Sequence, residues 1–162
     1  IGGDPVAARI SKVNGFQQLP TAGAEHQVIL DLPNGVYSGG FSAPATTTSD
    51  LVIPETGYYK ISGTKYQSGA NCYMTMGLRS WGPGQAATPL PQFLALVQGE
   101  RPDKTGAWDM QQYGAIDQVL LVAGTRLQFF ARRENGDSTS AVWGNGNYVG
   151  TVIAIELQRA SL

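Results

Sequence analysis

The stretch Ile-Pro-Glu-Thr-Gly-Tyr-Tyr-Lys-Ile-Ser at residues 53–62 decides the fold class, because it joins a strand entry, a turn and an alternating strand. Pro54 has a fixed φ and no amide hydrogen, so it suits the edge or entry of a strand. After the Thr-Gly turn, Tyr59 and Ile61 fall on one face, and the residues that alternate with them fall on the other. The stretch therefore predicts a β-strand that has one face in the core.

The composition of this 162-residue chain favours a single β-rich domain. Its 21 glycines and 9 prolines, against 14% charged residues, indicate many turns between short elements. No window keeps the apolar period of an α-helix, so helix is predicted to be a minor component. The net charge of -1 gives no electrostatic footprint for nucleic acid. No apolar run approaches the roughly 20 residues that a membrane span needs.

The single cysteine, Cys72, excludes an internal disulfide and is predicted to be a small buried hydrophobe. The chain begins Ile-Gly-Gly without Met, so we expect either a processed protein or the end of a longer polypeptide. It has no Asn-x-Ser/Thr sequon. We interpret residues 1–6 as a lead-in segment and residues 7–162 as one domain.

The rest of the chain shows short alternating segments separated by turn residues. Strands are predicted at 7–13, 27–32, 51–53, 72–80, 93–97, 115–122, 125–133 and 150–158. The tight Ala123-Gly124 turn predicts that the two strands beside it pair as a β-hairpin. About eight to ten strands in one domain indicate a sandwich or a barrel.

The strand before the Ala123-Gly124 turn is apolar on both faces. Ile116, Leu120 and Val122 alternate with Val119 and Leu121. Because only one side of a sheet faces the core of a sandwich, the other side needs a cover. We expect that cover to be a neighbouring subunit in a closed ring, and the alternative is a loop of the same chain.

Four short motifs follow one another along the chain. They are Ala8-Arg9-Ile10 with Val28-x-Leu30-Asp31, then Gly57-x-Tyr59-x-Ile61, then Val119-x-Leu121-x-x-Gly124-x-x-Leu127, and finally Gly150-x-Val152-Ile153-Ala154-Ile155. In order and spacing they resemble the C1q/TNF-like jelly-roll superfamily. The opening is similar to C1q-like modules of phage virion proteins and bacterial collagen-like proteins. Leu51 and Pro44 stand where the family has aromatic residues, and Ile61 stands where phenylalanine is usual; these departures count against the mammalian C1q subgroup more than against the fold.

The resemblance implies an all-β fold, a ten-stranded two-sheet antiparallel jelly-roll sandwich that assembles as a homotrimer. By the family's alternation, the trimer interface would comprise Tyr58, Lys60, Ser62, Ile116, Gln118, Leu120, Tyr148, Val152 and Ala154. The core would be filled by Tyr59, Ile61, Val119, Leu121, Ile153 and Ile155.

No catalytic constellation is visible, so we expect no enzyme, no bound metal and no cofactor. The single histidine, His26, has no metal-ligand or nucleophile motif around it. An enzyme acting on glycans would need two carboxylates about 5–10 Å apart in one cleft. Trp81, Trp108 and Trp143 lie in or near predicted loops, either as contacts for a sugar or a protein or as packing residues.

These expectations lead to a non-enzymatic trimeric surface module of a phage virion. It would be a capsid decoration, a spike or a tail-fibre tip, used for structural stabilisation or host attachment. Its partners would be other copies of itself, other virion or cell-surface proteins and a host surface glycan, with no nucleic acid and no membrane insertion. The alternative is the head domain of a bacterial collagen-like adhesin on a cell or spore surface.

Overall fold

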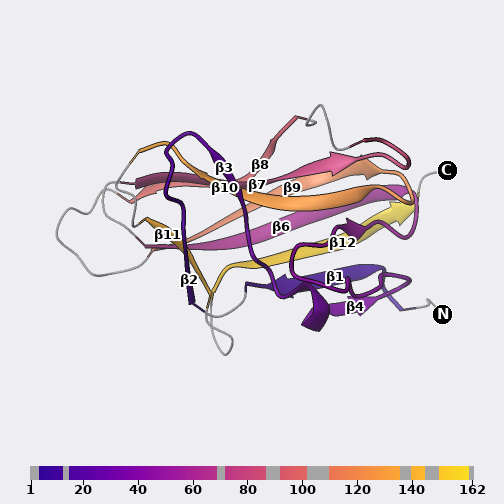
Figure 1. Cartoon of the computed structure of the whole chain (residues 1–162). Helices are drawn as coiled ribbons and strands as arrows, with labels where there is room; N and C mark the ends of the chain where they lie inside the picture. The colour runs from indigo at the N-terminus through magenta and orange to yellow at the C-terminus, as the bar shows by residue number, and fades with distance from the viewer. Residues whose placement is uncertain are drawn as a thin grey trace.

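The computed structural model describes residues 4–12, 15–68, 72–86, 92–101, 110–135, 140–144 and 150–160. Figure 1 shows two β-sheets stacked as layers, and every strand pair described is antiparallel. The helical segment described in these residues is the single 3-10 turn η1 (Leu32–Asn34). None of the described segments forms a helix that is long and apolar enough to cross a membrane.

One layer, sheet A, has seven strands in the described residues. Its order is β2 (Gly15–Gln18), β11 (Ala141–Gly144), β6 (Gly57–Ser68), β12 (Val152–Ala160), β1 (Ala7–Ser11) and β4 (Val36–Ser38), and β9 (Met110–Leu121) pairs with the other edge of β6. The second layer, sheet B, has five described strands. Its order is β3 (Glu25–Gln27), β10 (Arg126–Arg133), β7 (Cys72–Trp81) and β8 (Leu94–Arg101), and β5 (Leu51–Val52) pairs with β10.

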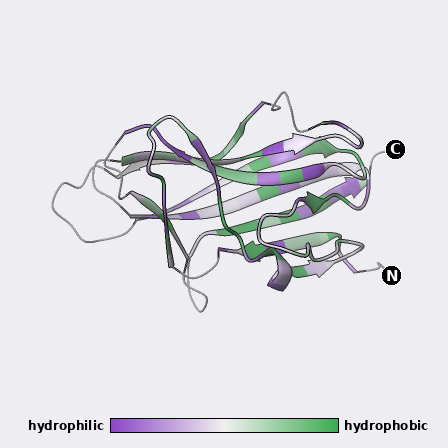
Figure 2. Ribbon diagram, viewed as in Figure 1, coloured by the Kyte–Doolittle hydropathy of each residue, from purple (hydrophilic) through white to green (hydrophobic). Residues whose placement is uncertain are grey.

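Strand β6 carries the stretch that opened the sequence analysis, and it lies at the centre of sheet A. Tyr59 and Ile61 are buried, whereas Tyr58 and Lys60 are only half-buried, as the alternation predicts. The pairing of β6 with β12 is continuous across Gly63, so the alternation continues to the end of the strand. Figure 2 shows the corresponding change between hydrophobic and hydrophilic residues along the strands.

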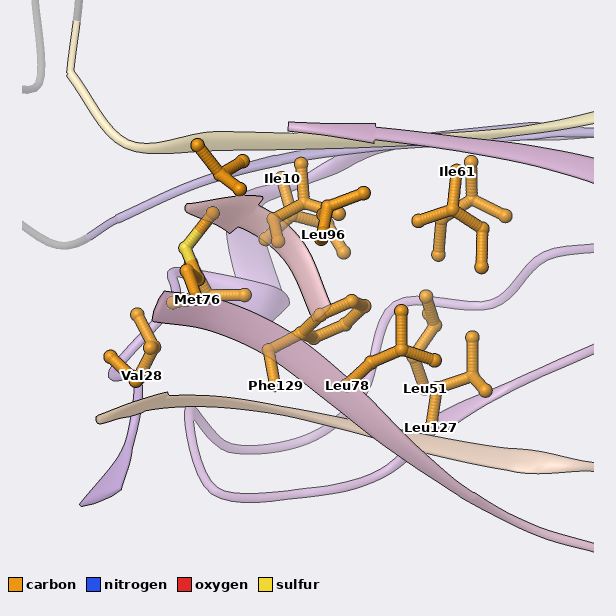
Figure 3. Close-up of a cluster of buried hydrophobic side chains, with 14 of the residues drawn as sticks. Ile10, Val28, Leu51, Ile61, Met76, Leu78, Leu96, Leu127 and Phe129 are labelled. Atoms are coloured by element: carbon orange, nitrogen blue, oxygen red, sulfur yellow. The ribbon is translucent and has the colours of Figure 1, made fainter. Parts of the chain in front are cut away.

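The core fills the space between the two sheets. Figure 3 shows side chains such as Ile61 from sheet A and Leu78 and Leu127 from sheet B within one cluster. The predicted core residues Tyr59, Ile61, Leu121, Ile153 and Ile155 are buried, and Val119 packs against them. Cys72 is buried as a free thiol, which confirms that prediction too.

The predicted late β-hairpin is wrong. Strand β9 pairs with β6 in sheet A, whereas β10 pairs with β7, β3 and β5 in sheet B. Gly124, at a φ of 84°, lies in the turn that carries the chain from one layer to the other. The two strands therefore lie in different layers, and each can turn an apolar face toward the core.

The strand predicted at 27–32 also divides between the layers. Gln27 pairs with Phe130 in sheet B, but Leu30 forms an isolated bridge to Lys12, next to β1 of sheet A. Because the chain crosses from one sheet to the other within these residues, the continuous strand ends at Gln27. Val28 and Leu30 are nevertheless buried, as their alternation indicates.

One side of the sandwich is closed where β8 approaches β9. A Cβ atom added to Gly114 would lie 2.0 Å from the carbonyl oxygen of Leu96, so only glycine fits there. This contact brings the edge of sheet B against the edge of sheet A. The opposite surface of β9 and its neighbours faces away from the core.

Candidate self-association surface

The outer face of sheet A is the surface of β6, β9 and β12 that points away from sheet B. Alternation puts every second side chain of these strands on it, since the intervening ones enter the core. We call this surface the outer A face. Its members are Tyr58, Lys60, Ser62 and Thr64 of β6, Tyr113, Ala115 and Leu120 of β9, and Val152, Ala154 and Glu156 of β12.

The middle of the outer A face is built from small side chains. Ser62 lies opposite both Ala115 and Ala154 in the pairing of the three strands. The adjacent row places Thr64 between Tyr113 and Val152. Small residues in neighbouring strands leave a flat surface, against which another backbone or sheet can approach closely.

Two larger apolar side chains project from this surface. Tyr113 is 68% exposed and Leu120 is 51% exposed, so no described part of the chain covers them. Exposed apolar side chains on one face are a feature of interaction surfaces. This pair lies near opposite ends of β9 and frames the small-residue centre.

A charged row crosses one end of the outer A face. Lys60 Nζ lies 3.7 Å from Asp117 Oδ1, and Glu156 occupies the position opposite Lys60 on β12. Both members of the ion pair are well exposed, so the pair contributes at most about 1 kcal/mol. Alternating charge of this kind contributes more to the register of an approaching surface than to its affinity.

Beyond the charged row, Tyr58 lies between Leu120 and Arg159 in the pairing. The guanidinium carbon of Arg159 is 4.4 Å from the centre of the Tyr58 ring. A cation-π contact at an exposed site contributes about 0.5–1 kcal/mol and fixes the ring's orientation. This row therefore places the Tyr58 ring, oriented by Arg159, beside the exposed side chain of Leu120.

Ile116 is not on the outer A face, and that part of the prediction is wrong. Asp117 and Gln118 together oppose Lys60, so β9 carries a β-bulge. Gln118 takes a φ of 58° and is exposed. The extra residue reverses the alternation, and Ile116 packs against the core opposite Ile61. Leu120, after the bulge, lies where the prediction put it.

The other predicted site residues divide into three groups. Tyr58, Lys60, Ser62, Leu120, Val152 and Ala154 lie together on the outer A face. Tyr148 and Trp108 lie outside the described residues, and of Trp143 the structure describes only the backbone in β11. Trp81 is 3% exposed at the end of β7, which agrees with a packing role and not with a ligand platform.

Sequence reasoning missed Tyr113, Ala115 and Thr64 as members of the outer A face. The signal was present, because the alternation of β6 continues past Gly63 to Thr64. On β9 the predicted strand began at Ala115, and the true strand starts five residues earlier. A search for alternation through the glycines would have found these residues.

Two of the described carboxylates, Glu25 and Asp50, form ion pairs within the subunit. Glu25 accepts two hydrogen bonds from Arg79, at 2.8 and 2.6 Å, and both side chains are mostly buried. Asp50 accepts from Gln128 at 2.5 Å and lies 3.4 Å from Arg126. Within the described ranges no three His, Cys, Asp or Glu residues come together as a metal site. These two carboxylates are thus engaged by cations of the same sheet.

Comparison with solved structures identifies the fold. A structure of Eiger TNF from S. frugiperda has a TM-score of 0.60 and 15% identity, over 98% of this chain and 96% of that one. A crystal structure of murine APRIL at pH 8.0 has a TM-score of 0.60 and 14% identity, over 95% of this chain and 98% of that one. No protein-family model and no curated protein sequence matches the chain.

The fold is a TNF-like, two-sheet antiparallel jelly roll, and the predicted fold class is confirmed. At such low identity the likeness concerns the fold alone. Association into trimers stays a prediction. The same holds for the resemblance to phage and bacterial modules.

Proposed function

We propose that this chain is a non-enzymatic homotrimeric module whose subunits associate through the outer A face. The observation that carries the proposal is the outer A face, in which the exposed Tyr113 and Leu120 of β9 frame a centre of small side chains. Exposed apolar surface costs free energy in water, and burial against another subunit recovers about 25 cal/mol for each Å². In a threefold ring all three copies bury this surface at once, because each subunit contacts one neighbour with it and the other neighbour with a second surface.

The small-residue centre of the outer A face favours a sheet or strand edge as the covering element. Ser62, Ala115 and Ala154 hold no long side chain that would keep a neighbour at a distance. The charged row of Asp117, Lys60 and Glu156 lies at one end, where it can select the register of the neighbour. The alternative cover, a loop of the same chain, does not occur over Leu120 or Tyr113 within the described part.

For the location of this module we propose the surface of a phage virion, as a capsid decoration, spike or tail-fibre tip. The support is the resemblance of the opening motif, Ala8-Arg9-Ile10 with Val28-x-Leu30-Asp31, to C1q-like modules of phage virion proteins. A rigid β-sandwich with variable connecting loops is suited to stabilising a particle or attaching it to a host glycan or protein. The alternative is the head of a collagen-like adhesin on a bacterial cell or spore.

Two measurements test the proposal. Light scattering of the full chain at micromolar concentration is expected to give the mass of three subunits, and a monomer would overturn the assembly. An antibody against the chain is expected to label intact phage particles in electron micrographs of the source culture. Labelling of cells or spores in place of particles would support the adhesin alternative.

A further inference from the structure

Two side chains of β6 reach across the core to the backbone of β7. Lys65 Nζ donates a hydrogen bond to the carbonyl oxygen of Met74 at 2.5 Å. Gln67 Nε2 donates one to the carbonyl oxygen of Cys72 at 2.6 Å. Because β6 belongs to sheet A and β7 to sheet B, both bonds join the two layers. We call this pair of hydrogen bonds the interlayer clasp.

The clasp has the spacing of an antiparallel ladder. Its donors are two residues apart on β6, and its acceptors are two residues apart on β7. Stacked sheets lie about 10 Å apart, too far for backbone groups to pair, so long side chains complete the rungs. Lysine and glutamine are long enough to do this from inward-facing positions. The clasp therefore fastens the end of the sandwich where the chain passes from β6 to β7.

One rung of the clasp carries an amine that has no described carboxylate beside it. Lys65 is 0% exposed, and none of the described carboxylates forms an ion pair with it. The titratable and charged groups at buried positions around it are the Cys72 thiol of β7, the Arg133 guanidinium of β10 and, across Thr151, the Lys12 amine at the end of β1. Arg133 is itself bonded to carbonyl oxygens of residues 19 and 20. A protonated amine at this position therefore has one described acceptor and no counter-charge.

The residues that pair directly with the two clasp donors on β9 and β11 are uncharged. Gln112 of β9 lies directly opposite Lys65, and Val142 of β11 lies opposite Gln67. Within the described part, Gln112 Oε1 and Gln67 Oε1 are buried and accept no hydrogen bond. Burial lowers the pKa of Lys65 from 10.5 to about 7, and the neighbouring Cys72 opposes this only in part.

We propose that the interlayer clasp is a proton-linked fastener, in which opening of this end of the sandwich is coupled to uptake of one proton by the Lys65 amine. The neutral amine keeps a hydrogen for the Met74 carbonyl and needs no counter-charge. When the clasp opens, water solvates the amine and it takes a proton at any pH below its ordinary range. Acid therefore favours the open form.

The sign and range of the effect follow from linkage. Above about pH 7 the closed form is neutral, and up to about pH 10.5 the open form is protonated. Across that window the opening constant rises about tenfold for each unit by which the pH falls. Below about pH 7 both forms carry the proton, so the constant stops changing. The fastening is therefore strongest at about pH 10.5 and above, weakens as the pH falls, and is weakest below about pH 7.

The single thiol of the chain lies within the clasp and reports its opening. Cys72 is buried, so a disulfide reagent such as 4,4′-dithiodipyridine reaches it through opened molecules. We would measure its labelling rate in the native full chain and in Lys65→Met between pH 6 and 10. The ratio of the two rates removes the pH dependence of the thiol chemistry itself.

The expected ratio of wild type to Lys65→Met rises about tenfold per unit from pH 9 to pH 7.5 and levels off below pH 7. Arg132→Met is the control, because Arg132 carries its charge on the outer side of sheet B, outside both the clasp and the outer A face. The ratio for that control is expected to stay flat. A flat ratio for Lys65→Met would overturn the proposal.

If Lys65→Met does not fold, a second measurement on the native chain tests the proposal. The Cε chemical shift of Lys65 in the native chain, followed by NMR, gives the titration midpoint of its amine directly. A midpoint near neutral pH supports the proton-linked fastener. A midpoint near that of a solvent-exposed lysine overturns it. Neither measurement depends on the proposed trimer or on its location.

Discussion

Replacement of Leu120 by aspartate is expected to convert the trimer into monomers. Leu120 is half exposed in the single chain, at the edge of the outer A face and opposite Tyr58. Its exposed half is the part that a neighbouring subunit would cover. The substitution removes that apolar area and places a carboxylate where we expect a dry contact.

The magnitude can be worked from the exposure. Full burial of a leucine side chain contributes about 1.5–3 kcal/mol, so its exposed half contributes about 1 kcal/mol at each interface. Three interfaces then lose about 3 kcal/mol, which is more than a hundredfold in the trimer's dissociation constant at about 1.4 kcal/mol per decade. An uncompensated buried carboxylate adds several kcal/mol more at each contact. The free energy of unfolding of one subunit should change by less than about 1 kcal/mol.

Sedimentation or light scattering at micromolar concentration measures the assembly, and urea unfolding of the dissociated chain measures the fold. Val52→Asp is the matched control, since Val52 is 48% exposed but lies in β5 of sheet B. It is expected to leave the trimer intact. If Leu120→Asp kept the trimer, the outer A face would not be the interface. If both variants dissociated it, the effect would not belong to this surface.

Three further substitutions test the structure of the subunit. Gly114→Ala puts a Cβ atom 2.0 Å from the carbonyl oxygen of Leu96 and is expected to lower the free energy of unfolding by about 3 kcal/mol in urea; an unchanged midpoint would contradict the close approach of β8 and β9. Glu25→Gln breaks the two-bond pair with Arg79, whose side chains are mostly buried, and should cost about 1–3 kcal/mol with little effect of added salt; strong salt dependence would indicate an exposed pair. Gln118→Gly relieves the φ of 58° at the bulge and should raise the thermal midpoint by a few degrees, whereas a lower midpoint would show that the residue is not strained.

Matched controls are available for two of these variants. Gly82→Ala adds a Cβ atom that meets only the end of the exposed Gln85 side chain at 3.2 Å, so its cost should be small. Glu134→Gln removes the exposed partner of Arg132 and should change the free energy of unfolding by less than about 1 kcal/mol. If a variant and its control lost the same free energy of unfolding, the close contact at Gly114 or the buried pair at Glu25 would not explain the loss.

The interior lysine shows the limit of reasoning from alternation. The period of β6 places Lys65 on the same face as Ile61, which is a core position. No feature of the neighbouring sequence indicates that a lysine side chain can be buried at this position. Its acceptor, the carbonyl oxygen of Met74, belongs to the other layer, and only the stacking of the two sheets brings it within reach.

The sequence by itself determined which side chains share a face along an uninterrupted stretch of strand, because a strand repeats every two residues whatever its partners are. For that reason Tyr59, Ile61 and Leu121 could be assigned to the core and Leu120 to the opposite face before any pairing was known. Only the tertiary structure decided the pairing itself: β9 and β10 separate into different layers, and the bulge at Asp117 and Gln118 turns Ile116 inward. Such choices depend on contacts between distant segments, and one extra residue reverses every face beyond it.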